Sequence, residues 1–200
     1  MWPSKLCKTE YLSRWWSIET KNFWRFIKLN ILQIETINRE LFLPFGDIIE
    51  KKNSSKKYTI NQGTTTRHSE ISKLDLNINN GESFISIFSG EPRKFPIEIK
   101  ILEKHPLATQ TFLPIQNFEW LVVVAEEKNN LPNLNSLRCF KINSQLGITY
   151  NTNIWHHPLL VLKNHDFWVI DRINNNEKNN ENLVEFDFEE NDYAYINLDI

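Results

Sequence analysis

The feature that most constrains the fold is a series of short runs in which β-branched or aromatic residues occupy every second position. A period of two puts alternate side chains on one face of the chain, which is typical of β-strands. Turn signals such as Asn79-Asn80-Gly81 and Gly90-Glu91-Pro92 separate the runs. Strands are expected over residues 29–34, 58–61, 71–78, 83–89, 97–105, 119–125, 138–142, 159–162 and 166–171. This pattern predicts an all-β sandwich or barrel with minor α, including a short helix near residues 38–44 that Pro44 ends.

Composition and net charge limit the kinds of molecule that the protein is expected to bind. The chain has 200 residues, enough for one domain, and a net charge of −2 with a pI near 6.2, so nothing favours nucleic acid or a membrane surface. A small-molecule partner is expected. The longest apolar run, residues 120–125, is far shorter than the roughly 20 residues of a membrane span. The two cysteines, Cys7 and Cys139, form no disulfide framework, so we predict a cytoplasmic protein.

The first 28 residues differ from the rest. They contain four of the seven Trp residues and more Lys and Arg than Glu, and they lack the apolar core and cleavage site of a secretory signal. Three interpretations are open: a helix packed on the domain, a basic and aromatic segment that seeks surfaces, or an upstream stretch that is not translated. We favour the third. The predicted organisation is an N-terminal extension over residues 1–28 and one domain over residues 29–200.

Two short segments carry the candidate chemistry. Glu103 and His105 are two residues apart in an alternating run, so both leave the same face of a strand, while Lys104 leaves the other face. Pro106 favours an extended His105 and cannot donate to a sheet, which puts the pair at a sheet rim. His156 and His157 precede another proline. A carboxylate with imidazoles can bind a divalent metal or transfer protons, although a solvated Glu and a hydrogen-bonded rim His explain the residue types equally well.

Four segments in collinear order resemble the ureidoglycolate lyase family, enzymes of allantoin breakdown in purine nitrogen metabolism. They are residues 61–67 (Asn-Gln-Gly-Thr-Thr-Thr-Arg), 103–114 (Glu-Lys-His-Pro-Leu-Ala-Thr-Gln-Thr-Phe-Leu-Pro), 154–159 (Ile-Trp-His-His-Pro-Leu) and 166–172 (Asp-Phe-Trp-Val-Ile-Asp-Arg). Residues 45–50 match the family's opening motif, so the resemblance extends from about residue 29 to about residue 197.

The resemblance implies a cupin-like double-stranded β-barrel and a homodimer. Cupin metal sites usually take two His and a Glu from a first motif and one His from a second. The comparable positions here are Glu103, His105, Gln110 and His156. Relatives have been associated with nickel, so a divalent metal is the one cofactor the resemblance suggests. Because Gln110 offers only a neutral oxygen, we expect weaker metal binding than at a His-rich site.

The implied reaction cleaves (S)-ureidoglycolate to glyoxylate and urea. A base must take the hydroxyl proton while the departing nitrogen gains one, so one acid and one base suffice. The residues expected to act in catalysis are His105, His156, His157 and Glu103. By resemblance, Arg67 is the candidate for the substrate carboxylate, because a guanidinium fits that group. The remaining candidates for substrate binding are Asn61, Gln62 and Gln110.

One departure from the family bears on activity. Many relatives carry an aromatic residue, a His and an acidic residue after the motif Arg, whereas this chain has His68, Ser69 and Glu70 after Arg67. A shift of one residue in a strand reverses the face that the imidazole occupies. Two alternatives to the lyase therefore remain: a ligand-binding or metabolite-sensing module without turnover, and a metal-dependent hydrolase that releases ammonia.

Overall fold

Two large sheets share a core of side chains, and this arrangement positions the candidate site. The computed structural model describes residues 30–143, 145–174 and 181–197. The chain divides into two units, residues 1–30 and 31–200. The predicted extension over residues 1–28 lies outside the described residues.

Strands account for most of the regular structure, which confirms the all-β prediction. They are β1 (Asn30–Ile31), β2 (Ile34–Thr36), β3 (Gly46–Ile49), β4 (Lys56–Ile60), β5 (Thr65–Ser69), β6 (Glu82–Gly90), β7 (Ile97–Ile99), β8 (Ile101–Lys104), β9 (Gln110–Pro114), β10 (Trp120–Ala125), β11 (Glu127–Lys128), β12 (Leu131–Pro132), β13 (Arg138–Ile142), β14 (Gly147–Tyr150), β15 (Trp155–His156), β16 (Leu160–Val161), β17 (His165–Ile173), β18 (Val184–Asp187) and β19 (Ala194–Ile196). Single 3₁₀ turns lie at η1 (Lys51–Asn53), η2 (Asn61–Gly63), η3 (Ile78–Asn80), η4 (Leu134–Ser136) and η5 (Glu190–Asp192).

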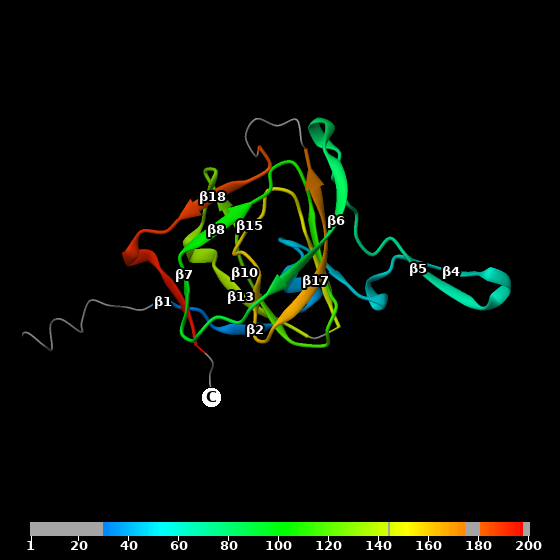
Figure 1. Cartoon of the computed structure of the whole chain (residues 1–200), viewed down its shortest axis with the longest axis horizontal. Helices are drawn as coiled ribbons and strands as arrows, with labels where there is room; N and C mark the ends of the chain where they lie inside the picture. The colour runs from blue at the N-terminus through cyan, green and yellow to red at the C-terminus, as the bar shows by residue number, and fades with distance from the viewer. Residues whose placement is uncertain (1–29, 144, 175–180, 198–200) are drawn as a thin grey trace, which may run out of the picture. The chain divides into compact units, whose positions relative to one another are not determined.

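The larger sheet has the strand order β18-β8-β15-β10-β13-β2, with β16 also pairing with β10. The second sheet has the order β3-β14-β9-β17-β6. Figure 1 shows β8, β10, β13 and β15 facing β6 and β17. One hydrophobic core lies between the sheets, because it contains inward residues of both, such as Val122 and Phe140 from the first and Phe112 and Phe167 from the second. Two facing sheets of this kind agree with the predicted double-stranded barrel.

The central strand β10 of the larger sheet is buried on both faces. Trp120, Val122 and Val124 of β10 join the core between the two large sheets. Leu121 and Val123, which point the other way, join a second core. The small sheet β1-β19-β7 contributes Ile97, Ile99, Ala194 and Ile196 to this second core. A strand covered on both faces reads as a continuous apolar run, which is the pattern of residues 120–125.

The predicted helix is present as α2 (Arg39–Phe42), where the Asn38 side chain accepts a hydrogen bond from the Leu41 amide at 3.0 Å. One predicted strand was wrong: residues 71–77 form no regular element, and only isolated bonds such as Thr109 N to Asp75 O tie this segment down. Its alternating side chains do not lie in a sheet because no neighbouring strand pairs with it. Among the described residues, no helix is long and apolar enough to cross a membrane.

Candidate active site

Strand pairing brings the two predicted segments together. In the antiparallel pair of β8 and β15, Glu103 lies opposite His156, and His105 follows immediately after β8. Glu103 Oε1 is 3.5 Å from His156 Nε2, and the rings of His105 and His156 have centroids 5.4 Å apart. One ligand atom from each of the three residues lies within 4.8 Å of the other two. We call Glu103, His105 and His156 the carboxylate–imidazole cluster.

Both imidazoles of the cluster present a free nitrogen. His105 Nδ1 is 2.8 Å from the carbonyl oxygen of Asn182, and His156 Nδ1 is 2.8 Å from that of Ile154. A carbonyl oxygen only accepts, so each Nδ1 carries the proton. Both Nε2 atoms are buried and have no hydrogen-bond partner in the described part of the chain. With the proton on Nδ1, each ring offers an Nε2 lone pair that can take a second proton or ligate a metal.

The pKa values of both Glu103 and His105 are lowered in the cluster. Burial, followed by the neighbouring His156, lowers the pKa of His105. Burial alone would raise the pKa of Glu103, but the imidazoles, with His156 first, lower it overall. At neutral pH, Glu103 is therefore ionised and His105 is neutral.

Three residues of the second sheet, Tyr150, Gln110 and Asp171, lie around the cluster, and of these the sequence predicted only Gln110. The Tyr150 ring stacks on His156 with centroids 4.2 Å apart and planes at 18°, and burial raises the pKa of Tyr150. Gln110, a predicted site residue, pairs with Tyr150 in register. Burial also raises the pKa of Asp171, against a hydrogen bond with Gln110 that lowers it. The sequence could have identified Asp171 through the alternation of β17, because Asp171 follows the buried Phe167 and Val169 on the same face of that strand.

His157, predicted to be catalytic, is not brought into the cluster. Its Nδ1 is 2.6 Å from the Pro158 carbonyl oxygen, and its Nε2 is 3.4 Å from Arg93 Nη1, which can donate to it. Burial lowers the pKa of His157 to about 4. Both nitrogens of this neutral ring are therefore engaged. Lys104 also points away, as alternation predicted, with Nζ bound to Glu127 and 4.8 Å from the Trp155 ring centre.

The predicted substrate-binding residues Arg67, Asn61 and Gln62 lie apart from the cluster. They belong to the hairpin of β4, η2 and β5, where all three side chains are exposed. Asn61 and Gln62 form its tip with φ values of 52° and 58°, the left-handed region that an Asn accepts better than most residues. At the base of the hairpin Ser69 is buried, and its hydroxyl has no hydrogen-bond partner among the described residues.

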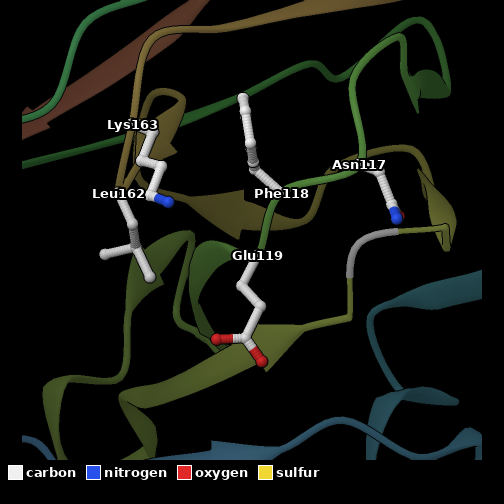
Figure 2. A pocket seen from close by; sticks show the side chains of 5 residues that line it. All are labelled: Asn117, Phe118, Glu119, Leu162 and Lys163. Carbon is white, nitrogen blue, oxygen red and sulfur yellow. The ribbon is translucent and has the colours of Figure 1, made fainter.

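A separate pocket, with a volume of about 270 Å³, is shown in Figure 2. Its polar groups are the Glu119 carboxylate, the Lys163 ammonium and the Asn117 amide, and Lys163 Nζ lies 5.2 Å from the Phe118 ring centre. None of its described lining residues is a histidine. The residues that line it are Asn117, Phe118, Glu119, Leu162 and Lys163. The cluster, with its two unpartnered imidazole nitrogens, is the stronger candidate for chemistry.

Comparison with known proteins shows to which family this chain belongs. A family model described as ureidoglycolate lyase matches residues 29–194. The chain belongs to the ureidoglycolate lyase family. It is 38% identical over 162 residues to ureidoglycolate lyase 1 of Rhizobium meliloti (strain 1021), covering 80% of this chain and 91% of that protein. It is 37% identical over 145 residues to a ureidoglycolate lyase of Burkholderia mallei (strain NCTC 10229), covering 72% and 84%. A Brucella anthropi ureidoglycolate lyase is 36% identical over 163 residues, covering 81% and 92%. The family prediction is confirmed.

For this member of the ureidoglycolate lyase family, the donor set of the cluster fits a divalent metal. Glu103, His105 and His156 supply a carboxylate oxygen and two imidazole nitrogens, and the buried Gln110 Oε1 also has no hydrogen-bond partner in the described segments. Imidazole nitrogens and carboxylate oxygens suit ions such as nickel or zinc. The cluster can therefore hold such an ion.

Proposed function

We propose that the protein is a carbon–nitrogen lyase that cleaves (S)-ureidoglycolate to glyoxylate and urea. The observation that carries the proposal is the convergence of Glu103, His105 and His156, with two free imidazole nitrogens, in a chain of the ureidoglycolate lyase family. The reaction requires proton transfer and no nucleophile, which is the chemistry that such a cluster offers.

His156 is the proposed base. Its Nε2 takes the hydroxyl proton of the substrate, the carbonyl of glyoxylate forms, and the bond from carbon to the ureido nitrogen breaks. The His156 imidazolium then gives its proton to that nitrogen, which leaves as part of urea. His156 thus accepts and returns the same proton, and no second acid is needed. Glu103, 3.5 Å from Nε2, stabilises the imidazolium between the two transfers. The Tyr150 ring, stacked on His156, holds the imidazole plane in place.

His105 and Gln110 are proposed to orient the substrate. His105 is held neutral by burial, so its Nε2 accepts a hydrogen bond from a ureido N–H group. If a divalent ion is bound, Glu103, His105 and His156 would hold it, and the ion would polarise the hydroxyl oxygen of the substrate. We further propose a homodimer that works in the cytosol; the family resemblance supports the first point, and the free, buried thiol of Cys139 supports the second.

A single-turnover assay of the full chain with ureidoglycolate tests the proposal, with glyoxylate, urea and ammonia followed with and without a chelator. Equal amounts of glyoxylate and urea, lost in His156→Ala, are expected. Ammonia in place of urea, abolished by chelation, would indicate the metal-dependent hydrolase. Tight glyoxylate binding without turnover would indicate the sensing module, for which the separation of Arg67 from the cluster within one chain is the observation in favour.

A further inference from the structure

Three polar side chains form a row across neighbouring strands of the second sheet. Tyr150 of β14 lies opposite Gln110 of β9. In the register of β9 with β17, Ile170 lies opposite Thr111, so the next residue of β17, Asp171, comes opposite Gln110. Residues directly opposite in an antiparallel pair share a face, with Cβ atoms about 4.5–5.5 Å apart. We call Tyr150, Gln110 and Asp171 the polar row.

The polar row points inward, towards the carboxylate–imidazole cluster. The residues two positions away in β9 and β17, Phe112 and Val169, belong to the core between the two large sheets, and residues two apart in a strand share a face. At one end of the row, the Tyr150 ring stacks on His156 with centroids 4.2 Å apart. Asp171 forms the other end. The row is therefore the wall of the site that faces the cluster.

Two oxygen atoms of the polar row are buried acceptors that lack a partner. They are Gln110 Oε1 and Asp171 Oδ1, neither of which has a hydrogen-bond partner in the part of the chain that the structure describes. Burial raises the pKa of Asp171, and a hydrogen bond from Gln110 opposes this shift. A bond that lowers the pKa of a carboxyl group stabilises its anion, so the Gln110 amide nitrogen is the donor and Oε1 stays free. Leaving buried acceptors unpaired is unfavourable, which indicates that a ligand supplies the donors.

The ureido end of the proposed substrate has the matching donors. A ureido group ends in an NH2 group, whose two N–H bonds diverge in one plane and can reach two neighbouring acceptors. The carboxylate at the other end of the substrate has no hydrogen to donate, so it does not fit these oxygens. The hydroxyl is assigned to His156 as the group that loses its proton. The polar row therefore fits the terminal NH2 of the substrate.

We propose that Asp171 is a specificity-determining residue of the site, which recognises the terminal NH2 of the ureido group. One N–H bond donates to Asp171 Oδ1 and the other donates to Gln110 Oε1. The inference rests on the proposed function, since the ureido compound is the substrate proposed there, and it adds a residue that selects this substrate. Asp171 takes no proton in this role, and His156 keeps both proton transfers.

Two unreactive ligands that differ in this one group test the inference. Ureidoacetate carries the terminal NH2 but lacks the hydroxyl, so it cannot be cleaved by the proposed reaction. N-acetylglycine carries a methyl group of similar size in place of the NH2. Titration calorimetry of the full chain measures Kd for each. Wild type should bind ureidoacetate at least about tenfold more tightly than N-acetylglycine, the lower end of what a hydrogen bond to a charged group contributes.

Substitutions in β17 assign this preference to one residue. Asp171→Ala should reduce the preference for ureidoacetate at least about fivefold, mainly by weakening ureidoacetate binding. Asp171→Asn, which keeps the shape and one carbonyl oxygen, should lie between this variant and wild type. The matched control is Asp166→Ala, because Asp166 lies on the other face of β17 and accepts a hydrogen bond from Gln116 at 3.0 Å. It should keep the wild-type preference.

The ratio of the two Kd values separates ligand recognition from folding, because both are measured on the same folded molecules. Equal weakening of both ligands in Asp171→Ala would show that Asp171 only supports the fold, and this would overturn the inference. A wild-type protein that binds the two ligands equally, or binds no ureidoacetate, would also overturn it. Failure of wild type to cleave ureidoglycolate, with the preference present and lost in Asp171→Ala, would refute the proposed function and leave the role of Asp171 in ligand selection standing.

Discussion

The two halves of the predicted site differ in how firmly the chain holds them. The carboxylate–imidazole cluster is held by strand pairing, by carbonyl oxygens that fix each imidazole, and by a stacked tyrosine. The hairpin of residues 56–69, which carries Arg67 and is called the arm below, has exposed side chains and few contacts beyond itself. The comparison teaches that the groups proposed for proton transfer are pre-organised inside one chain, whereas the residue proposed to bind the substrate's carboxylate lies on a segment that the chain itself does not fix.

The largest expected effect lies in the cluster. His156→Ala removes the proposed base and should lower kcat by about 10²–10⁴-fold, the usual contribution of general acid–base catalysis. The neighbouring His157→Gln is the matched control, because His157 contacts Arg93 and Pro158 instead of the cluster. Single-turnover release of glyoxylate measures both variants. Equal losses in the two would remove the distinction drawn between these adjacent histidines.

The next effect concerns stability. Phe112 contacts the rings of Phe88, Trp120, Tyr150 and Phe167, so Phe112→Ala should lower the free energy of unfolding by about 3–5 kcal/mol. Ile60→Ala on the arm should change it by no more than about 0.5 kcal/mol at a concentration too low for association. Urea denaturation measures both changes. A large loss in the arm variant would mean that the arm is part of the cooperative fold of one chain.

A third prediction uses the pH dependence of stability. The pKa of His157 is lowered from 6.5 to about 4 by burial, so the unfolded chain binds a proton at a pH at which the folded protein does not. The contribution of His157 to the free energy of unfolding is fully present above pH 6.5. As the pH falls from 6.5 towards 4, the free energy of unfolding decreases by about 3 kcal/mol because of this residue. The difference in unfolding free energy between wild type and His157→Gln should change by this amount across that range. A constant difference would show that the folded protein accepts the proton readily.

The smallest effects compare two ion pairs. Lys56 and Glu70 are both more than half exposed, so Lys56→Met should leave the melting temperature unchanged at physiological salt. Lys104, whose side chain is 7% exposed, pairs with Glu127, and Lys104→Met should lower the melting temperature because the carboxylate loses its cationic partner and keeps only the Asn153 amide. Scanning calorimetry of the two variants would contradict the comparison if their order were reversed.

Much of this could be predicted from the sequence. The period of two identified most strands and placed Glu103 and His105 on the side of β8 away from Lys104, as the contacts of these residues show. The pairing of β8 with β15, which brings in His156, depends on contacts far apart in the chain and entered only through the family resemblance. Asp171 and Tyr150 were missed because their role arises from facing Gln110 and His156 across two sheets. Residues 71–77 failed as a strand because alternation cannot show whether a pairing partner exists.

The position of β10 has a further consequence. Alternate side chains of β10 belong to two different cores. Neither face of this strand therefore accepts a polar residue, and only apolar substitutions of similar volume should be tolerated along it. Its amides should exchange with deuterium only through global unfolding, while those of the arm exchange through local opening. The strand beside His156 should therefore be the slowest-exchanging wall of the site.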